Sequence, residues 1–368
     1  MLAALLLGAA CATAGAATPA APVQPAGRVS VQDGKTLLRD CRPWVPHGLS
    51  FFGRVIPKGW KSDTGTMAAQ AAFGPANLAQ AKDWQSDVVR FQMGLPFLDP
   101  QSPNFAAGYA AELADAVSAA RREGLTVVLS MKPQGRTNLK APETMPGEAS
   151  LRAWQKLGPL FAADLGVVYE LFNEPHSARL PSAAEWDAWR QGHQAIIDAL
   201  RRAAVPNVLF IDGLNGGRTL QGAPALRDPL GQLAYAVHPY LRGDLNTPAE
   251  WDRSFGNFAA SHPLVVTEWT HLAANCRGAD GAAAQAFVSY LERKRIGLIA
   301  YGLDSADNRL SVPGAGRQAP TRFEGQACSA PGAGPGEDIQ RMFSRQTALA
   351  EKARPVAACG LPSGRAGP

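Results

Sequence analysis

One short stretch decides the fold of this chain: Val167-Val168-Tyr169-Glu170-Leu171-Phe172-Asn173-Glu174-Pro175. Its first part is apolar apart from one glutamate, and it ends in a polar pair followed by proline. A short apolar run with β-branched and aromatic residues, bounded by a turn residue, indicates a strand buried in a parallel sheet. Asn173 and Glu174 would then lie at the carboxyl end of that strand, where parallel α/β folds place functional side chains.

Similar apolar runs recur on both sides of this stretch. The run at 167–172 is the fourth of eight, and the others lie at 45–51, 88–93, 126–131, 208–211, 234–237, 264–267 and 297–303. Between them, 104–123 and 182–203 carry apolar residues at helical spacing, and Ser182 with Glu185 forms a capping box. Alternating strands and helices predict an α/β fold with a parallel sheet, and eight strands close a (β/α)8 TIM barrel.

Both ends of the barrel region have patterns of their own. Residues 28–42 alternate around Asp33-Gly34, which predicts an N-terminal β-hairpin at the bottom of the barrel. Residues 305–336 are rich in Gly and Pro, so we expect a long loop on the active face, held by Cys328. A last helix is expected over 337–353. One domain would therefore cover residues 28–360.

Polar residues follow several predicted strands at the same end of the barrel. They are Arg90, Asn173, Glu174, His238, Tyr240, Glu268 and Trp269. Strands four and seven face each other across a barrel mouth, so Glu174 and Glu268 would meet there. Retaining hydrolysis of a glycosidic bond needs two carboxyl groups about 5 to 5.5 Å apart, one neutral and one ionised. Arg90 and Tyr240 are suitable donors to keep Glu268 ionised, and His238 lies near enough to tune Glu174.

Four motifs, in order along the chain, resemble glycoside hydrolase family 5, the cellulase family. They are Val89-Arg90 in the second strand, Val168 to Pro175 in the fourth, Tyr235-Ala236-Val237-His238-Pro239-Tyr240 in the sixth, and Val266-Thr267-Glu268-Trp269 in the seventh. The resemblance extends from about residue 31 to residue 307. Four motifs in register are far more specific than a lone Asn-Glu-Pro. The resemblance implies a retaining β-glycosidase on a (β/α)8 barrel, with no cofactor.

The resemblance also implies a role for each residue. Asn173 would hydrogen-bond the sugar 2-hydroxyl, Glu174 would act as general acid and then base, and Glu268 would form the glycosyl-enzyme intermediate. The residues that orient Glu268 or support the cleft would be Arg90, Tyr240 and His238.

Structural alternatives stay open for the same residues. Each glutamate could be an ordinary strand-end carboxylate. Arg90 could form an ion pair with Glu170 inside the barrel, which is compatible with a role at Glu268. His238 could be a satisfied histidine beside a proline turn.

Three positions depart from the family pattern. Lys132 stands where the family usually has a histidine, Phe52 where it often has a histidine, and Tyr301 where it often has a tryptophan. These changes leave both glutamates in place but alter the floor of the subsite that holds the cleaved sugar. Lys132 would lower the pKa of a carboxylate or bind an acidic sugar, and the alternative is a surface lysine that snorkels.

Two tryptophans are candidates for stacking under sugar rings. An aromatic face matches the apolar face of a pyranose. Trp269 follows the seventh strand, and Trp60 lies in the loop after the first. For both, the alternative is simple packing. No Cys or His cluster has metal-ligand spacing, so we expect no zinc site.

The composition limits the partners and suggests export. The formal charge is +5 over 368 residues with basic residues scattered, so we expect no nucleic-acid surface. Residues 1–17 resemble a signal peptide, too short to span a membrane, and 18–27 form an Ala/Pro linker. Cys11 could alternatively anchor a lipid. We expect a secreted or periplasmic monomer.

Four cysteines remain once the leader is removed, and they permit two disulfides with three possible connectivities: Cys41, Cys276, Cys328 and Cys359. From the fold, we expect Cys276 to pair with Cys328 after the last two strands. Cys41 and Cys359 would join the chain termini at the other end of the barrel. The alternative is four free thiols.

Together these patterns predict a retaining hydrolase of β-1,4-linked polysaccharide, an endo-β-glucanase of the cellulase type. One alternative is the same chemistry on mannan, xylan or another β-glycan. Another is a barrel that binds glycans without cleaving them, because Phe52, Lys132 and Tyr301 have altered the site.

Overall fold

The computed structural model describes most of the chain: residues 26–60, 73–133, 143–243, 245–271, 281–304, 309–312, 319–323, 328, 330, 332–357 and 359. The expected signal peptide, Cys11 and nearly all of the expected linker lie outside the described residues, so they stay predictions. Within the described part, none of the helices combines the length and apolar character that a bilayer crossing requires.

Eight strands form a closed barrel, which confirms the predicted (β/α)8 fold. Neighbouring strands are parallel throughout, and β11 pairs with β4 to close the ring. The predicted strands match them closely, and their bounds are β4 (His47–Phe51), β5 (Val88–Gly94), β6 (Thr126–Lys132), β7 (Val167–Glu170), β8 (Leu209–Asp212), β9 (Leu233–Val237), β10 (Leu264–Trp269) and β11 (Gly297–Tyr301).

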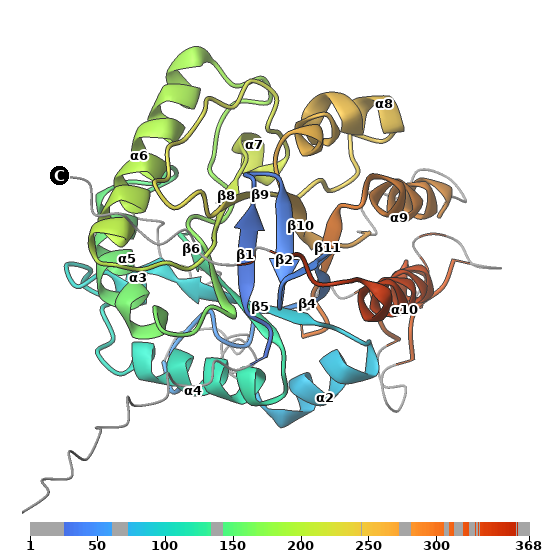
Figure 1. Cartoon of the computed structure of the whole chain (residues 1–368), viewed down its shortest axis with the longest axis horizontal. Coiled ribbons are helices and arrows are strands. Elements are labelled where there is room, and N and C mark those ends of the chain that lie inside the picture. The colour runs from blue at the N-terminus through green and yellow to red at the C-terminus, as the bar shows by residue number, and fades with distance from the viewer. Residues whose placement is uncertain are drawn as a thin grey trace, which may run out of the picture.

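Helices surround the barrel (Figure 1). They are α2 (Pro75–Asp83), α3 (Leu95–Leu98), α4 (Tyr109–Arg122), α5 (Glu148–Leu157), α6 (Ala183–Arg202), α7 (Leu214–Gly217), α8 (Pro248–Trp251), α9 (Ala282–Lys294) and α10 (Gly336–Lys352), with short turns η1 (Gly158–Phe161), η2 (Asp252–Gly256) and η3 (Phe258–Ala260). The capping box is present, since Ser182 Oγ accepts from the Glu185 N–H at 3.2 Å. The helix expected from residue 104 begins only at Tyr109, because residues 100–108, with two prolines, form turns.

Side chains alternate between the inside and the outside of the barrel. Along β5, Val88 belongs to the cluster inside the barrel, whereas Val89 and Phe91 belong to the larger core between strands and helices. The period of two therefore directs Arg90 and Gln92 into the barrel. All seven residues of β5 are buried, so these two polar side chains lie in the interior.

An N-terminal sheet covers the bottom of the barrel, as predicted. It consists of β1 (Val29–Gln32), β2 (Thr36–Arg39) and a third strand, β3 (Arg42–Pro43), which was not expected. Val29, Val31 and Leu37 pack into the same cluster as the barrel-interior Val168. Figure 1 shows β1 and β2 across the end of the barrel.

A disulfide joins the two ends of the domain. Cys41 and Cys359 are bonded, with their Cα atoms 5.2 Å apart, which confirms the predicted pairing of these two cysteines. Cys276 lies outside the described residues, so its pairing with the buried Cys328 stays a prediction. Half of the loop expected over 305–336 also lies outside them.

Candidate active site

Glu174 follows β7 in an unusual backbone conformation. Its φ of 56° is in the left-handed region, which is unfavourable for a residue with a Cβ. The Glu174 N–H donates to Asp212 Oδ2 at 2.9 Å, and the preceding Asn173 N–H donates to the Met131 carbonyl at 2.8 Å. These two bonds anchor the turn to β8 and β6. The Glu174 side chain remains 26% exposed at the mouth of the barrel.

Glu174 and Glu268 meet across the barrel mouth. One carboxylate oxygen of each, together with a ring nitrogen of His238, lie within 4.8 Å of one another. A carboxyl pair at about this separation suits a nucleophile and an acid/base on one glycosidic bond, whereas inversion needs about 6.5 to 9.5 Å to admit a water. The structure therefore brings together the pair that the sequence predicted.

Three donors hold Glu268 in place. Tyr240 donates its hydroxyl to Oε1 at 2.9 Å. Arg90 Nη1 and Gln92 Nε2 both donate to Oε2, at 3.0 and 2.7 Å. These three bonds fix the direction of both carboxyl oxygens of Glu268.

Arg90 is the centre of a buried network. It forms a two-pronged ion pair with Glu170, at 2.6 and 2.9 Å, and its Nη2 also donates to Asn173 Oδ1 at 2.7 Å. Ser50 and Ser130 accept further bonds from its guanidinium. Arg90 thus pairs with Glu170 and also contacts Glu268, so the two alternatives considered for it from sequence hold together. The negative charge of Glu170 balances the buried guanidinium.

His238 lies behind the Glu174 carboxylate. Its Nδ1 is 3.2 Å from Glu174 Oε1, and its Nε2 is 3.0 Å from Thr267 Oγ1. Burial alone would lower the pKa of His238, but the negative charge of Asp212, 3.6 Å away, and that of Glu268 raise it to about 10. The imidazole is therefore protonated at neutral pH.

The contact that raises the pKa of His238 lowers the pKa of the Glu174 carboxyl. Burial alone would raise the pKa of Glu174, but the hydrogen bond from His238 and the positive charge of Lys132 lower it to about 2. In the free protein, the proton shared by the two groups therefore resides on His238. Because the groups are in contact, they titrate as a pair that holds one proton over a wide pH range.

Gln92 and Asp212 are functional candidates that the sequence analysis missed. Gln92 is fully buried, and Asp212 is fully buried beside His238. Burial and the charge of Glu170 raise the pKa of Asp212 well above its usual value. A signal was available for both, since Gln92 follows Arg90 by one strand period and Asp212 ends the fifth barrel strand.

The three positions that depart from the family pattern lie near one another. The rings of Phe52 and Tyr301 pack edge to face with centroids 5.1 Å apart. The Nζ of Lys132 lies 5.8 Å from the centre of the Phe52 ring. Lys132 is 7% exposed, so it is not a surface lysine.

The two tryptophans proposed for sugar stacking do not share the same surroundings. Trp269 is completely buried and packs against Phe287 with ring centroids 4.8 Å apart, so its ring has no face open to a sugar. The expectation of stacking is corrected for this residue, because helix α9 covers it. Trp60 is half-buried and packs edge to face on Phe97 at 4.7 Å.

Among the residues that the structure describes, two groups have the donor types of a metal site. Glu170, Asp212 and His238 form one group, and Glu174, His238 and Glu268 form the other. Both depend on His238, whose raised pKa keeps it protonated, and a protonated imidazole has no lone pair for a metal. Arg90 already balances charge in both groups, so they fit a proton-sharing network better than a metal centre.

Comparison with known proteins places this site in a family. The family model described as cellulase (glycosyl hydrolase family 5) matches residues 63–307. The chain belongs to glycosyl hydrolase family 5. Among curated proteins, endoglucanase Z of Dickeya dadantii is 23% identical over 241 residues, which cover 63% of this chain and 51% of that protein. The chain thus spans about half the length of that relative.

Solved structures of the family share the fold. A β-glucanase of Saccharophagus degradans, crystallised with cellotetraose, superposes with a TM-score of 0.65 at 18% identity, over 88% of this chain and 94% of that one. The catalytic domain of an endoglucanase of Thermobifida fusca gives a TM-score of 0.58 at 15% identity, over 86% and 97%. At these identities the likeness shows the shared barrel.

Proposed function

We propose that this family 5 protein is a retaining endo-β-glucanase acting on β-1,4-linked polysaccharide. The observation that carries the proposal is the pair of carboxylates, Glu174 and Glu268, within 4.8 Å of each other at the barrel mouth. They differ in surroundings as the mechanism requires. Glu268 accepts three hydrogen bonds, and Glu174 contacts a protonated imidazole.

The first step forms a covalent intermediate. Glu268, held by Tyr240, Arg90 and Gln92, attacks the anomeric carbon, and the bond from that carbon to the leaving oxygen breaks. Glu174 delivers the proton to the leaving oxygen, and that proton comes from the pair that Glu174 shares with His238. As negative charge develops on the leaving oxygen, transfer of the proton from His238 through Glu174 becomes favourable.

The second step releases the sugar. Glu174, now ionised, removes a proton from water, and the water oxygen attacks the anomeric carbon from the face that the leaving group vacated. The ester bond to Glu268 breaks. Two displacements restore the original anomeric configuration. The proton taken from water restores the single proton that Glu174 shares with His238.

We also propose that Asn173 binds the sugar 2-hydroxyl. Its Oδ1 accepts from Arg90 at 2.7 Å, which orients the amide. Its Nδ2 is buried and has no hydrogen-bond partner among the described residues. A buried donor without a partner is costly, and a sugar hydroxyl would satisfy it. Such a bond strengthens as the oxocarbenium-like transition state forms.

The choice of glucan rests on the relatives, and the same chemistry on mannan or xylan is the alternative. The relatives named above are two endoglucanases and a β-glucanase by description, and the β-glucanase was crystallised with cellotetraose. Phe52, Tyr301 and Lys132 alter the family pattern near the cleaved sugar. A barrel that only binds glycans would not need the paired carboxylates with opposite surroundings.

Export is part of the proposal. The Cys41–Cys359 disulfide needs an oxidising compartment to form and persist. We propose a secreted or periplasmic monomer whose first residues, 1–17, act as a signal peptide.

A panel of polysaccharides tests the proposed activity. Reducing-sugar release is measured from carboxymethylcellulose, mixed-linkage β-glucan, mannan and xylan. Release from the first two supports the glucanase, and release from mannan or xylan alone assigns another β-glycan. Glu268→Ala and Glu174→Ala serve as the inactive controls. No release from any of the four contradicts the hydrolase.

A further inference from the structure

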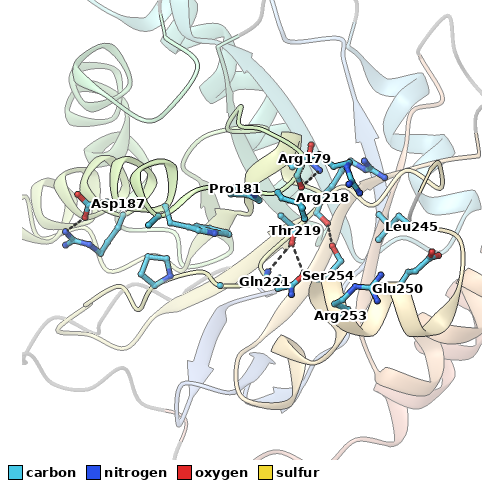
Figure 2. A pocket seen from close by; sticks show the side chains of 17 residues that line it. Arg179, Pro181, Asp187, Arg218, Thr219, Gln221, Leu245, Glu250, Arg253 and Ser254 are labelled. Carbon is cyan, nitrogen blue, oxygen red and sulfur yellow. Dashed lines mark hydrogen bonds and ion pairs between the residues drawn. The ribbon is translucent and has the colours of Figure 1, made fainter.

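A cavity of about 660 Å³ opens on the same face of the barrel as the glutamate pair. Its walls come from the segment after β7, the turn after β8, the start of α6, and the region of α8 and η2 (Figure 2). All these segments follow the carboxyl ends of barrel strands. The proposed reaction mechanism uses none of the residues that line this cavity.

The cavity wall is bonded to the backbone that carries the proposed acid. Asn215, which lines the cavity, donates its N–H to Ser177 Oγ at 2.8 Å. The next residue, Gly216, donates its N–H to the carbonyl of Pro175 at 3.0 Å. Pro175 directly follows Glu174, so the wall and the acid belong to one bonded unit.

The same wall also supports His238. The Gly217 carbonyl accepts the His238 N–H at 2.7 Å. Gly217 has a φ of +75°, and a Cβ there would lie 3.0 Å from the His238 ring, so only glycine allows this contact. Since Glu174 protonates the leaving oxygen, the sugar that departs with that oxygen lies on the Glu174 side. The cavity is therefore placed to receive the leaving-group part of the substrate.

Guanidinium groups dominate the charge of the cavity. Its described lining contains Arg179, Arg190, Arg218 and Arg253, against two carboxylates, Asp187 and Glu250. Asp244, next to the lining residue Leu245, lies outside the described residues, and with it the arginines still outnumber the acids. Figure 2 shows Arg179, Arg218 and Arg253 around one hollow.

Both described carboxylates already have local partners. Asp187 accepts from Arg190 at 2.7 Å and from Gln191 at 2.6 Å. Glu250 accepts the N–H groups of Asn246 and Thr247, at 2.8 and 2.9 Å, in a capping box. Their oxygens are therefore engaged in local structure.

The remaining walls suit a sugar ring. Trp186, Pro181 and Leu245 provide apolar surface beside the arginines. An apolar wall beside planar guanidinium groups fits a pyranose that carries an anionic substituent, because guanidinium binds carboxylate or sulfate with two parallel bonds. Lys132 adds a buried positive charge close to Glu174 itself.

We propose that this cavity binds an anionic sugar on the leaving-group side, so that the preferred substrate is a β-glycan bearing carboxylate or sulfate groups. The inference rests on the proposed function for the assignment of the leaving-group side. It assigns Arg179 and Arg253 as exposed residues that recognise the anionic group.

Matched oligosaccharides test this inference. The substrates are β-1,4-glucan tetrasaccharides that are neutral, oxidised to glucuronate at C6, or sulfated at C6 on the reducing side. We expect wild-type kcat/KM to favour an anionic form about tenfold at low salt, and the preference to shrink in high salt because exposed charges are screened. If the glucuronate substrate is preferred, the group that the cavity recognises is a carboxylate. If the sulfated substrate is preferred, that group is a sulfate.

Variants connect the preference to the cavity. In Arg179→Gln/Arg253→Gln, the ratio of anionic to neutral kcat/KM should fall close to one. Arg227→Gln is the matched control, because Arg227 is an exposed arginine in the segment after β8 and does not line the cavity. A ratio near one in the wild type, or a ratio unchanged in the double variant, overturns the inference.

Calorimetry separates this inference from the proposed function. Binding of the glucuronate tetrasaccharide to Glu268→Gln is compared with binding to the same variant that also carries Arg179→Gln/Arg253→Gln. Binding that weakens with the arginine changes supports the anionic site even if no substrate is cleaved, which would contradict the hydrolase alone. Equal binding by both contradicts the anionic site.

Discussion

The Nδ1 atom of His238 lies 3.2 Å from Oε1 of Glu174, and this contact joins the proposed acid to a completely buried imidazole. The pKa of His238 is raised to about 10, and the pKa of Glu174 is lowered to about 2. Between these values the two groups hold one proton, and that proton is lost only as the pH rises through the raised value. The proposed acid function of Glu174 therefore depends on the pair.

Replacing His238 tests this proton sharing. In His238→Gln, Glu174 alone must keep the proton, so the basic limb of the pH profile of kcat should move about two units or more to lower pH. The measurement is kcat against pH on the natural polysaccharide. His262→Gln, a histidine outside the site, should leave the profile unchanged. An unchanged basic limb in His238→Gln would contradict the shared proton.

Asp212 should also affect the basic limb of the pH profile of kcat, because it raises the pKa of His238. Asp212→Asn keeps an acceptor for the Glu174 N–H but removes the carboxyl group that raises the pKa of His238, so that pKa should fall and the basic limb with it. Asp212→Ala removes the acceptor too and should also reduce kcat at its optimum. Identical pH profiles and kcat values in both variants and the wild type would refute this role.

Gln92 should position the nucleophile. Its Nε2 donates to Glu268 Oε2 at 2.7 Å, and a hydrogen bond to a charged group contributes about 1.5 to 3 kcal/mol, so Gln92→Ala should lower kcat/KM about ten- to a hundredfold. The loss should be equal on polysaccharide and on aryl glycosides, because Glu268 attacks both. Gln101→Ala, an exposed control, should have no effect. A loss confined to thermal stability would assign Gln92 to structure.

The disulfide should stabilise the barrel without affecting the site. Cys41 and Cys359 close a loop of 318 residues in sequence. Cross-links of this kind typically contribute about 2 to 4 kcal/mol, so Cys41→Ser/Cys359→Ser should lower the free energy of unfolding by about that amount. Denaturant unfolding measures the change, and kcat at low temperature should stay within about twofold. Equal stability of the two proteins would show that the bond constrains little.

The fold was accessible from sequence because its signals are local. Apolar runs such as 126–131 and the cap at Ser182 depend on neighbouring residues, and β6 and α6 follow them closely. Glu174 and Glu268 were predictable because the topology of a barrel brings the ends of its strands to one rim. The predicted start of helix α4 was wrong because residues 100–108 form turns, although apolar residues at helical spacing begin earlier.

The remainder of the site depends on contacts between distant segments. Gln92 contacts Glu268 across the barrel, and only the three-dimensional arrangement shows that this side chain reaches the proposed nucleophile. Asp212 matters through its bond to the Glu174 backbone. Trp269 was expected under a sugar because of its position after the nucleophile, yet helix α9 covers it. Spacing along the chain does not report which face of a side chain is covered.

Covalent trapping of the nucleophile tests the central proposal most directly. The protein is incubated with a 2-deoxy-2-fluoro cellobioside that has a good leaving group, digested, and mapped by mass spectrometry. We expect one added glycosyl group on the peptide that contains Glu268, and none in Glu268→Gln. A label on another residue, or turnover of the reagent without any label, would contradict retaining catalysis by this pair.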